Sequence, residues 1–271
     1  MYGSFSITFL VNLFANVAFF LMKKITTSIL CFCFCSLLVL NAQQTVFDEV
    51  RVLYRSENAG GLLIHTNGFG FNYRKGKIVS DTKKRFYEID IVTLKHPKEI
   101  KKFNPYKEDT RGYFYGKKNA VLVIRPNIGY HTTFISKQTA KGVAVSLATH
   151  GGFSLAFAKP VYLEIKNWPY DSHEMVVEKY NEDKHFVDNI YGRANATKGI
   201  EETKIYPGIY GKFGLNFEYA PEQDVVRAME VGMMFDVYPK ALPIMAQKYV
   251  KQQNIYFNLY LNFLFGSRKY E

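Results

Sequence analysis

Hydrophobic and polar residues alternate along most of the chain with a period of two, which is the repeat of a β-strand and not of a helix. The clearest segment is 254–266, where every second residue from Ile255 to Phe265 is large and apolar. Similar alternation runs through 205–219 and 225–238. Roughly ten residues of such alternation is the length of a tilted strand that crosses a membrane.

The pattern predicts eight strands, at 61–73, 83–95, 118–131, 140–149, 150–165, 205–219, 225–238 and 253–266. An even number lets an antiparallel sheet close with both chain ends on one side. We therefore predict an all-β fold, an antiparallel up-and-down transmembrane β-barrel of about eight strands, with ten as the alternative count. For the turn at 149–152, one long bent strand is the alternative.

The connections between these strands are expected to differ at the two ends. With both termini on the periplasmic side, the outward connections are 74–82, 132–139, 166–204 and 239–252. The connection Lys95 to Lys118 then falls on the periplasmic side, where it is unexpectedly long and basic. Its lysines include Lys95, Lys98, Lys101, Lys102 and Lys107. This basic segment suits a periplasmic or envelope protein partner, or anionic headgroups, and a solvated loop is the alternative.

The first 42 residues resemble a targeting segment. Met22-Lys23-Lys24 supplies a basic start, an apolar run follows from Ile25 to Leu40, and Ala42 precedes a polar stretch. We expect 1–42 to be an N-terminal extension and signal peptide, with the true start at Met22 and cleavage after Ala42, and 43–271 to be a single barrel domain. The alternative is a pair of membrane helices broken at Lys23-Lys24, each short against the roughly 20 residues that a spanning helix needs.

Charge and cysteine content narrow the function classes. The 271 residues carry 35 Lys+Arg against 24 Asp+Glu, a net charge of +11, and contain only three cysteines. Because Cys31, Cys33 and Cys35 all lie in the predicted signal peptide, the exported protein is expected to lack disulfides and cysteine-bound metals. Export also makes nucleic acid an unexpected partner despite the positive charge.

The faces opposite the apolar ones mix both signs of charge. An eight-stranded barrel has an interior that side chains just fill, and charges buried there must be paired. We predict a salt-bridged polar plug, with a narrow charge-lined conduit as the alternative. The residues predicted to face inward are His65, Asn67, Glu88, Asp90, Arg125, Asn127, Ser146, Lys212, Asn216, Glu218, Glu230, Asp236, Asn258 and Asn262.

Periodicity alone does not tell inside from outside. A soluble periplasmic ligand-binding barrel would share the period but turn its apolar faces inward. We favour outer-membrane lipid as the environment, because the apolar faces are uniformly large and the opposite faces carry charge and glycine. Aromatic residues toward the strand ends are expected to form girdles. These are Tyr73, Tyr130, Tyr210, Tyr219, Tyr238, Tyr256 and Phe265.

Candidate catalytic residues are scattered. His131 with Ser136 form one set, and the long loop supplies another in His173, Glu174, His185 and Asp188. A nucleophile and its base must lie within hydrogen-bond reach, and nothing in the spacing brings these groups together. The spacing of His173, Glu174 and His185 matches no compact metal site either. We therefore expect no enzyme activity, no cofactor and no metal.

Several segments resemble small outer-membrane β-barrel proteins of the Bacteroidota. They are the Ala42-Gln43 junction, the strand from Gly60 to Gly70, the run Leu94 to Glu99 and a last strand ending in an aromatic residue and glycine. The chain departs from the common ending of such proteins because five residues follow Gly266. The resemblance implies an outer-membrane location and supplies no catalytic residues.

These observations predict a non-enzymatic outer-membrane barrel that serves as an envelope anchor, an assembly component or a binding module through its surface loops. The alternatives are a barrel-embedded enzyme, a narrow transporter, or a soluble periplasmic ligand-binding barrel.

Overall fold

The computed structural model describes residues 56–80, 82–104, 110–137, 142–166, 175–220, 222 and 224–269. All of them belong to one compact unit, Leu53–Glu271. The expected signal peptide, its start at Met22 and its cleavage site lie outside the described residues, as do Lys107, His173 and Glu174. In the described part, no helix has the length and apolarity needed to cross a membrane.

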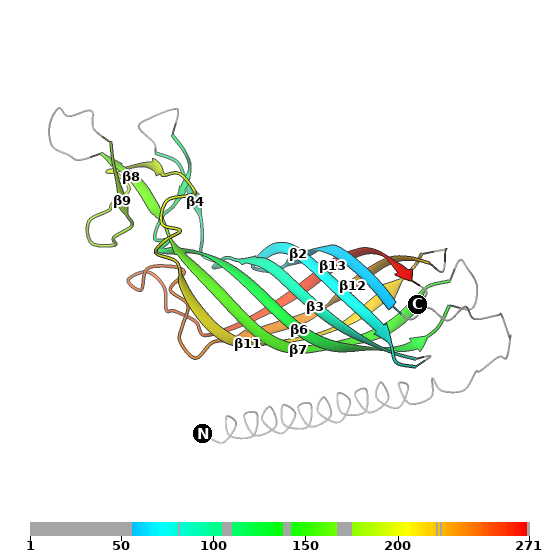
Figure 1. The fold of residues 1–271 in the computed structure, drawn as a ribbon. Helices are drawn as coiled ribbons and strands as arrows, with labels where there is room; N and C mark the ends of the chain where they lie inside the picture. The colour runs from blue at the N-terminus through cyan, green and yellow to red at the C-terminus, as the bar shows by residue number, and fades with distance from the viewer. Residues whose placement is uncertain are drawn as a thin grey trace, which may run out of the picture. The chain divides into compact units, whose positions relative to one another are not determined.

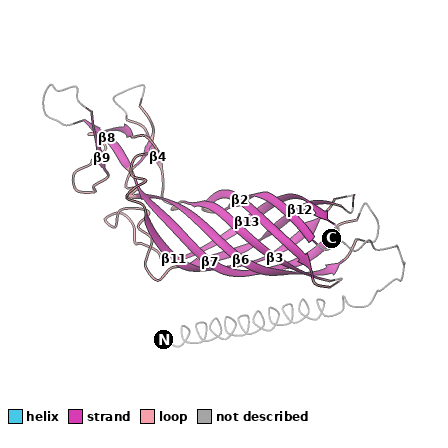
Figure 2. Ribbon diagram, viewed as in Figure 1, coloured by secondary structure: helices cyan, strands magenta, loops and turns pink. Residues whose placement is uncertain are grey.

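Eight antiparallel strands close into a barrel in the order β1-β13-β12-β11-β7-β6-β3-β2 (Figures 1 and 2). Closure joins the first strand to the last, with Ser56 opposite Lys269. The predicted fold class is therefore confirmed. The strands are β1 (Ser56–His65), β2 (Gly68–Ile78), β3 (Lys83–Leu94), β6 (Asn119–Ile135), β7 (Ala144–Pro160), β11 (Lys204–Glu218), β12 (Val225–Val237) and β13 (Ile255–Lys269).

The predicted count of eight was right because two errors cancelled. The segment 61–73, expected to be one strand, contains a hairpin in which His65 pairs with Gly68. Thr66 and Asn67 form the two-residue loop of this hairpin, and Gly68 is the first residue of β2. The alternation also changes phase here, because Leu62 and Ile64 point outward before the turn, and Phe69 and Phe71 after it.

The expected turn at 149–152 was wrong, and β7 is one strand of 17 residues. Gly151 pairs with Ile128 on one side and Gly211 on the other. Gly152 permits close approach to the neighbouring strand, because a Cβ added to it would stand 2.2 Å from the Pro126 carbonyl oxygen, whereas one added to Gly151 would meet nothing within 4 Å. Gly152 therefore marks a close backbone approach inside a strand and not a chain reversal.

The hairpin reverses the assigned ends of the connections that precede β7, and the absence of a turn at 149–152 restores those of the later connections. The short connections 79–82, 136–143 and 219–224 lie at the end where β1 begins and β13 ends. The segments 95–118, 161–203 and 238–254 all lie at the opposite end. The prediction that Lys95 to Lys118 shares an end with the chain termini was therefore wrong, as was the outward placement of 74–82 and 132–139.

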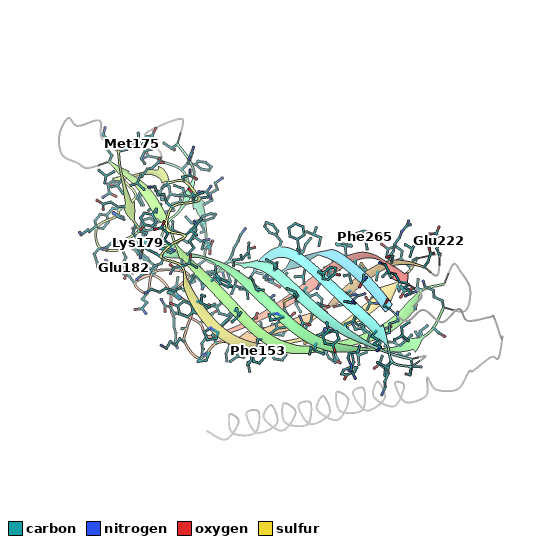
Figure 3. All side chains as sticks on the ribbon, in the orientation of Figure 1. Phe153, Met175, Lys179, Glu182, Glu222 and Phe265 are labelled. Atoms are coloured by element: carbon teal, nitrogen blue, oxygen red, sulfur yellow. The ribbon has the colours of Figure 1, made fainter. Side chains whose placement is uncertain are left out.

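The outer wall of the barrel is apolar. All eight strands contribute exposed hydrophobic side chains to this surface, and Phe153 and Phe265 are labelled on it in Figure 3. We call this set the apolar belt. It comprises Leu62, Ile64, Phe69, Phe71, Tyr73, Tyr87, Ile89, Ile91, Leu122, Ile128, Tyr130, Phe153, Ile205, Ile209, Phe213, Leu215, Val231, Met233, Phe235, Ile255, Phe257, Leu259 and Phe265.

Three of the tyrosines expected in aromatic girdles face inward instead. Tyr210, Tyr238 and Tyr256 are each at most 4% exposed, and the phenol of Tyr210 donates a hydrogen bond to Asp90 Oδ2 (3.0 Å). They lie on the polar faces that the alternation assigned to them. Their proximity to strand ends had suggested a girdle, and that prediction was wrong for these three. Tyr73, Tyr130, Tyr219 and Phe265 are exposed.

The connections at the end remote from the termini carry their own short strands. β4 (Lys101–Lys102) pairs with β5 (Tyr113–Phe114), and a three-stranded sheet has the order β10-β8-β9. Its strands are β8 (Tyr162–Lys166), β9 (Met175–Lys179) and β10 (Ile190–Arg193). We call the described residues of 95–118, 161–203 and 238–254 the cap (Figure 1).

Candidate functional site

The barrel interior holds most of the polar residues that the alternation assigned to it. Asn67 is the exception, because it lies half-buried in the β1-β2 turn and not on a strand. The buried residues are His65, Glu88, Asp90, Arg125, Asn127, Ser146, Lys212, Asn216, Glu218, Glu230, Asp236, Asn258 and Asn262.

One cluster is centred on Arg125 of β6. Its guanidinium donates to both carboxylate oxygens of Asp236 on β12, at 2.9 and 2.7 Å. The Ser154 hydroxyl donates to Asp236 Oδ1 (2.8 Å) and shares a second hydrogen bond with the Tyr238 phenol. A bidentate, charge-assisted pair of this kind fixes both distance and orientation between its strands.

A second cluster is centred on Lys212 of β11. Its ammonium pairs with Glu88 and, at 3.1 Å, with Glu230. Glu230 also accepts hydrogen bonds from Arg74 (3.0 Å) and from the Tyr260 phenol (2.8 Å). Each buried carboxylate here has a cationic partner, which is the condition for burying charge without a large desolvation penalty.

His131, weighed with Ser136 as a candidate catalytic set, has a different partner. His131 Nε2 lies 3.0 Å from His150 Nε2, and His150 Nδ1 lies 2.9 Å from Asn127 Oδ1. Ser136 is exposed in the connection after β6. The structure therefore gives His131 a place in the interior hydrogen-bond network and does not bring it to Ser136.

At the end near the termini, the interior closes with a third set of ion pairs. Glu57 binds Lys84 (2.9 Å) and Arg268 (3.3 Å), while Glu218 binds Arg268 (2.5 Å) and Lys137 (3.1 Å). These contacts tie β1, β3, β11 and β13 to the connection that follows β6. This end of the barrel is consequently filled with paired side chains.

The other mouth of the barrel is closed by apolar side chains. Leu242, Ile244 and Met245, from the connection between β12 and β13, are at most 6% exposed. They belong to one buried cluster with wall residues such as Leu94 and Val123. Asn119 of β6 donates its backbone N–H to Ile244 O (3.1 Å), which fixes this segment in the mouth.

Charge in the interior is balanced. Six cationic side chains accompany six carboxylates in the clusters described above. The cations are Arg74, Lys84, Arg125, Lys137, Lys212 and Arg268, and the carboxylates are Glu57, Glu88, Asp90, Glu218, Glu230 and Asp236. Such balance, with an apolar stopper at one mouth, is typical of a structural plug and not of an ion pathway.

Several interior residues were missed by the sequence analysis. Arg74 and Asn72 lie on β2, which was merged with β1, and His150 lies at the position expected to be a turn. Asn72 donates to Asp90 Oδ1 (2.5 Å), and Arg74 reaches Glu230. A hairpin placed at Thr66-Asn67 would have put both on the inward face.

The cap has a small core of its own. Tyr113, Leu163, Ile165, Tyr180, Ile190 and Ala246 pack together, so all three connections contribute to it. Backbone hydrogen bonds join them: Ala246 donates to Gly116 O (2.8 Å), Val161 to Lys118 O (3.0 Å) and Arg193 to Arg111 O (3.2 Å). The three connections therefore form one folded body in place of separate loops.

Most of the predicted basic segment is exposed on the cap. Lys95, Lys98, Lys101 and Lys102 are exposed, and three of them lie over aromatic rings. Lys95 Nζ is 5.5 Å from the ring centre of Phe69, and Lys101 Nζ is 4.8 Å from that of Phe103. Lysine stems thus lie along apolar surface while their charges remain in solvent.

Of the remaining described catalytic candidates, Asp188 is exposed and His185 has structural contacts in the cap. His185 is buried, accepts the Asn181 N–H at Nδ1 (3.0 Å) and lies 3.2 Å from Glu178 at Nε2. The hydrogen bond between Tyr115 and Tyr249 (3.1 Å) raises the pKa of Tyr115 to about 12. Within the described residues, no group of three or more His, Cys, Asp or Glu side chains is arranged to hold a metal ion.

Comparisons with known proteins give structural neighbours only. No protein-family model and no curated protein matches the sequence. Among solved structures, the chain is similar to Neisserial surface protein A, with a TM-score of 0.39 and 8% identity over 80% of this chain and 97% of that one. It is also similar to Ail, the attachment invasion locus protein of Yersinia pestis, with a TM-score of 0.38 and 8% identity over 80% of this chain and 100% of that one. The fold assignment rests on the closed strand order of this chain itself.

Proposed function

We propose that this protein is a non-enzymatic outer-membrane β-barrel that anchors the cap at the cell surface as a binding module. The observation that carries the proposal is the inside-out distribution of side chains, with the apolar belt outside and paired charges inside. Soluble monomers rarely expose contiguous apolar patches larger than about 300–600 Å². A belt to which all eight strands contribute suits lipid as the solvent.

The distribution of the connections supports an orientation. Outer-membrane barrels have short periplasmic turns and longer extracellular loops. Ser56 of β1 and Lys269 of β13 lie at the end of the connections 79–82, 136–143 and 219–224, whereas the three long connections lie at the opposite end with the two-residue β1-β2 turn. We assign the first end to the periplasm and the cap to the outside.

The filled interior supports an anchor in preference to a transporter. A solute or ion crossing the barrel would have to displace the Arg125–Asp236 pair, the Lys212 cluster and the apolar mouth formed by Leu242, Ile244 and Met245. Removing one partner of a buried pair costs about 3–5 kcal/mol, so opening several of them together is unfavourable.

The cap supports binding at the surface. β9 lies at the edge of the three-stranded sheet in the described part of the cap, with Met175, Val176 and Val177 exposed (Figure 3 labels Met175). An edge strand presents free N–H and C=O groups, to which an extended peptide can add as a further strand. The folded cap core holds this edge in place.

Two measurements test the proposal. Expressed protein should be recovered with the outer membrane, and unheated samples should migrate differently from heated ones on a detergent gel, because the closed barrel resists unfolding. Release as a soluble, detergent-independent protein would overturn the membrane assignment. In planar bilayers the purified barrel should show no steady conductance, whereas sustained open-channel currents would favour the transporter.

A further inference from the structure

A groove of about 450 Å³ lies where the barrel wall meets the cap. One side is formed by the β1-β2 hairpin, with Ile64, Thr66 and Phe69, and the other by the start of the basic segment, with Lys95, His96 and Glu99. Lys95 follows β3 directly and donates its backbone N–H to Asn67 O (2.8 Å), which holds the two sides together.

The hairpin side of the groove continues the apolar belt. Ile64 is 44% exposed and Phe69 is 51% exposed, and both point outward from the wall. A molecule in the groove would therefore touch the same surface as the lipid around the barrel, at the level where strands end and the cap begins.

The opposite side of the groove is cationic. Lys95 lines the groove and its Nζ lies over the Phe69 ring, and Lys98 is exposed just outside the lining, two residues after His96. The carboxylate in the groove is already satisfied, because Glu99 accepts the His96 N–H (3.0 Å) and pairs with Lys117. The two lysines therefore leave a net positive charge beside an apolar wall.

His96 adds an uncharged hydrogen-bond donor to the groove. Its Nδ1 accepts the backbone N–H of Lys98 (3.1 Å), so the neutral ring carries its proton on Nε2. Burial lowers the pKa of His96 below its usual value, which favours this neutral form near pH 7.

We propose that this groove binds an anionic, phosphate-bearing lipid of the surrounding bilayer, with a headgroup phosphate at Lys95 and Lys98 and an acyl chain along Ile64 and Phe69. The charge of the lysines complements the phosphate, and the wall complements the chain. The inference rests on the proposed membrane location.

The test is lipid retention by the full-length barrel in detergent, measured by native mass spectrometry with dioleoyl phosphatidylglycerol or phosphatidylcholine added. We expect a preference for phosphatidylglycerol, which K95Q/K98Q lowers about tenfold, since each lysine near an anionic surface attracts it independently. The matched control K75Q/K77Q removes two exposed lysines of β2 nearer the other end and should leave the preference unchanged.

A second pair of variants tests the apolar half. F69A should lower retention of phosphatidylglycerol, and F153A, which removes another exposed phenylalanine of the apolar belt elsewhere on the wall, should not. Glycerol 3-phosphate binding as tightly as the lipid, with no effect of F69A, would show a free phosphate ester site and overturn the proposal.

Heat-modifiable migration, measured on the same samples, tests the membrane barrel separately from the lipid groove. If migration is heat-modifiable but the two lipids are retained equally, or both lysine pairs matter equally, the groove assignment is wrong and the barrel stands. If the protein is soluble without detergent, the membrane location fails and this site fails with it.

Discussion

Arg125 and Asp236 meet face to face inside the barrel although β7 and β11 separate their strands in the sheet. Both side chains are fully buried, and two hydrogen bonds of 2.9 and 2.7 Å join them. The contact crosses the lumen, so it exists only when the sheet is closed. The alternation of each strand turns these side chains inward, and the curvature of the barrel then brings them together.

Replacing Asp236 with alanine should destabilise the barrel strongly. The change leaves the Arg125 guanidinium buried without its partner, which costs about 3–5 kcal/mol. The midpoint of urea unfolding in detergent, followed by the gel-mobility shift, measures the loss. The double variant R125M/D236A should recover part of it, and R227M, at an exposed position on β12, should have little effect. Equal midpoints for D236A and the wild type would contradict the assignment.

The orientation of the barrel is testable with single cysteines, because the cysteines of the sequence are confined to positions 31, 33 and 35. The substitution Lys198→Cys places a cysteine in the cap, and Ser80→Cys places one in a short connection at the other end. Both positions are exposed. A membrane-impermeant maleimide should label the first on intact cells and the second only after lysis. The reverse pattern would show that the cap faces the periplasm.

A substitution that weakens the core of the cap should leave the barrel folded. Leu163→Ala removes a side chain that is 1% exposed, and such truncations cost about 2–5 kcal/mol. Limited proteolysis should then cut the connections of the cap more rapidly, while the heat-modifiable shift of the barrel persists. Ile200→Ala, at a position 57% exposed, is the control. Loss of the gel shift in L163A would mean that barrel and cap fold as one.

The ion pair between Lys179 and Glu202 on the cap predicts a pH dependence. Hydrogen bonds from Lys179 (2.6 Å) and from the Tyr162 phenol hold the pKa of Glu202 below its usual 4.5. A lowered carboxyl pKa stabilises the folded cap above pH 4.5, and this contribution disappears as the pH falls through the lowered pKa. The 13C carboxyl shift of Glu202 should titrate at higher pH in K179M than in the wild type, and an unchanged titration would exclude the contact.

The alternation by itself determined the fold class and the two faces of most strands. Tyr87, Ile89 and Ile91 are exposed, and Glu88 and Asp90 are buried, as the period of two requires. This rule is local, because neighbouring side chains on an extended chain point to opposite sides whatever the rest of the molecule does.

Only the tertiary structure decided where strands reverse and which connections share an end. The chain reverses at Thr66-Asn67, whereas Gly151 and Gly152 lie inside β7 and pair with β6 on one side and β11 on the other. Each turn flips the ends of every later connection, so the turn at Thr66-Asn67, which was not predicted, moved the basic segment to the end opposite Ser56 and Lys269. The partner of each interior charge could not be predicted from the sequence either. Contacts such as Arg125–Asp236 form between strands that closure alone brings together across the lumen.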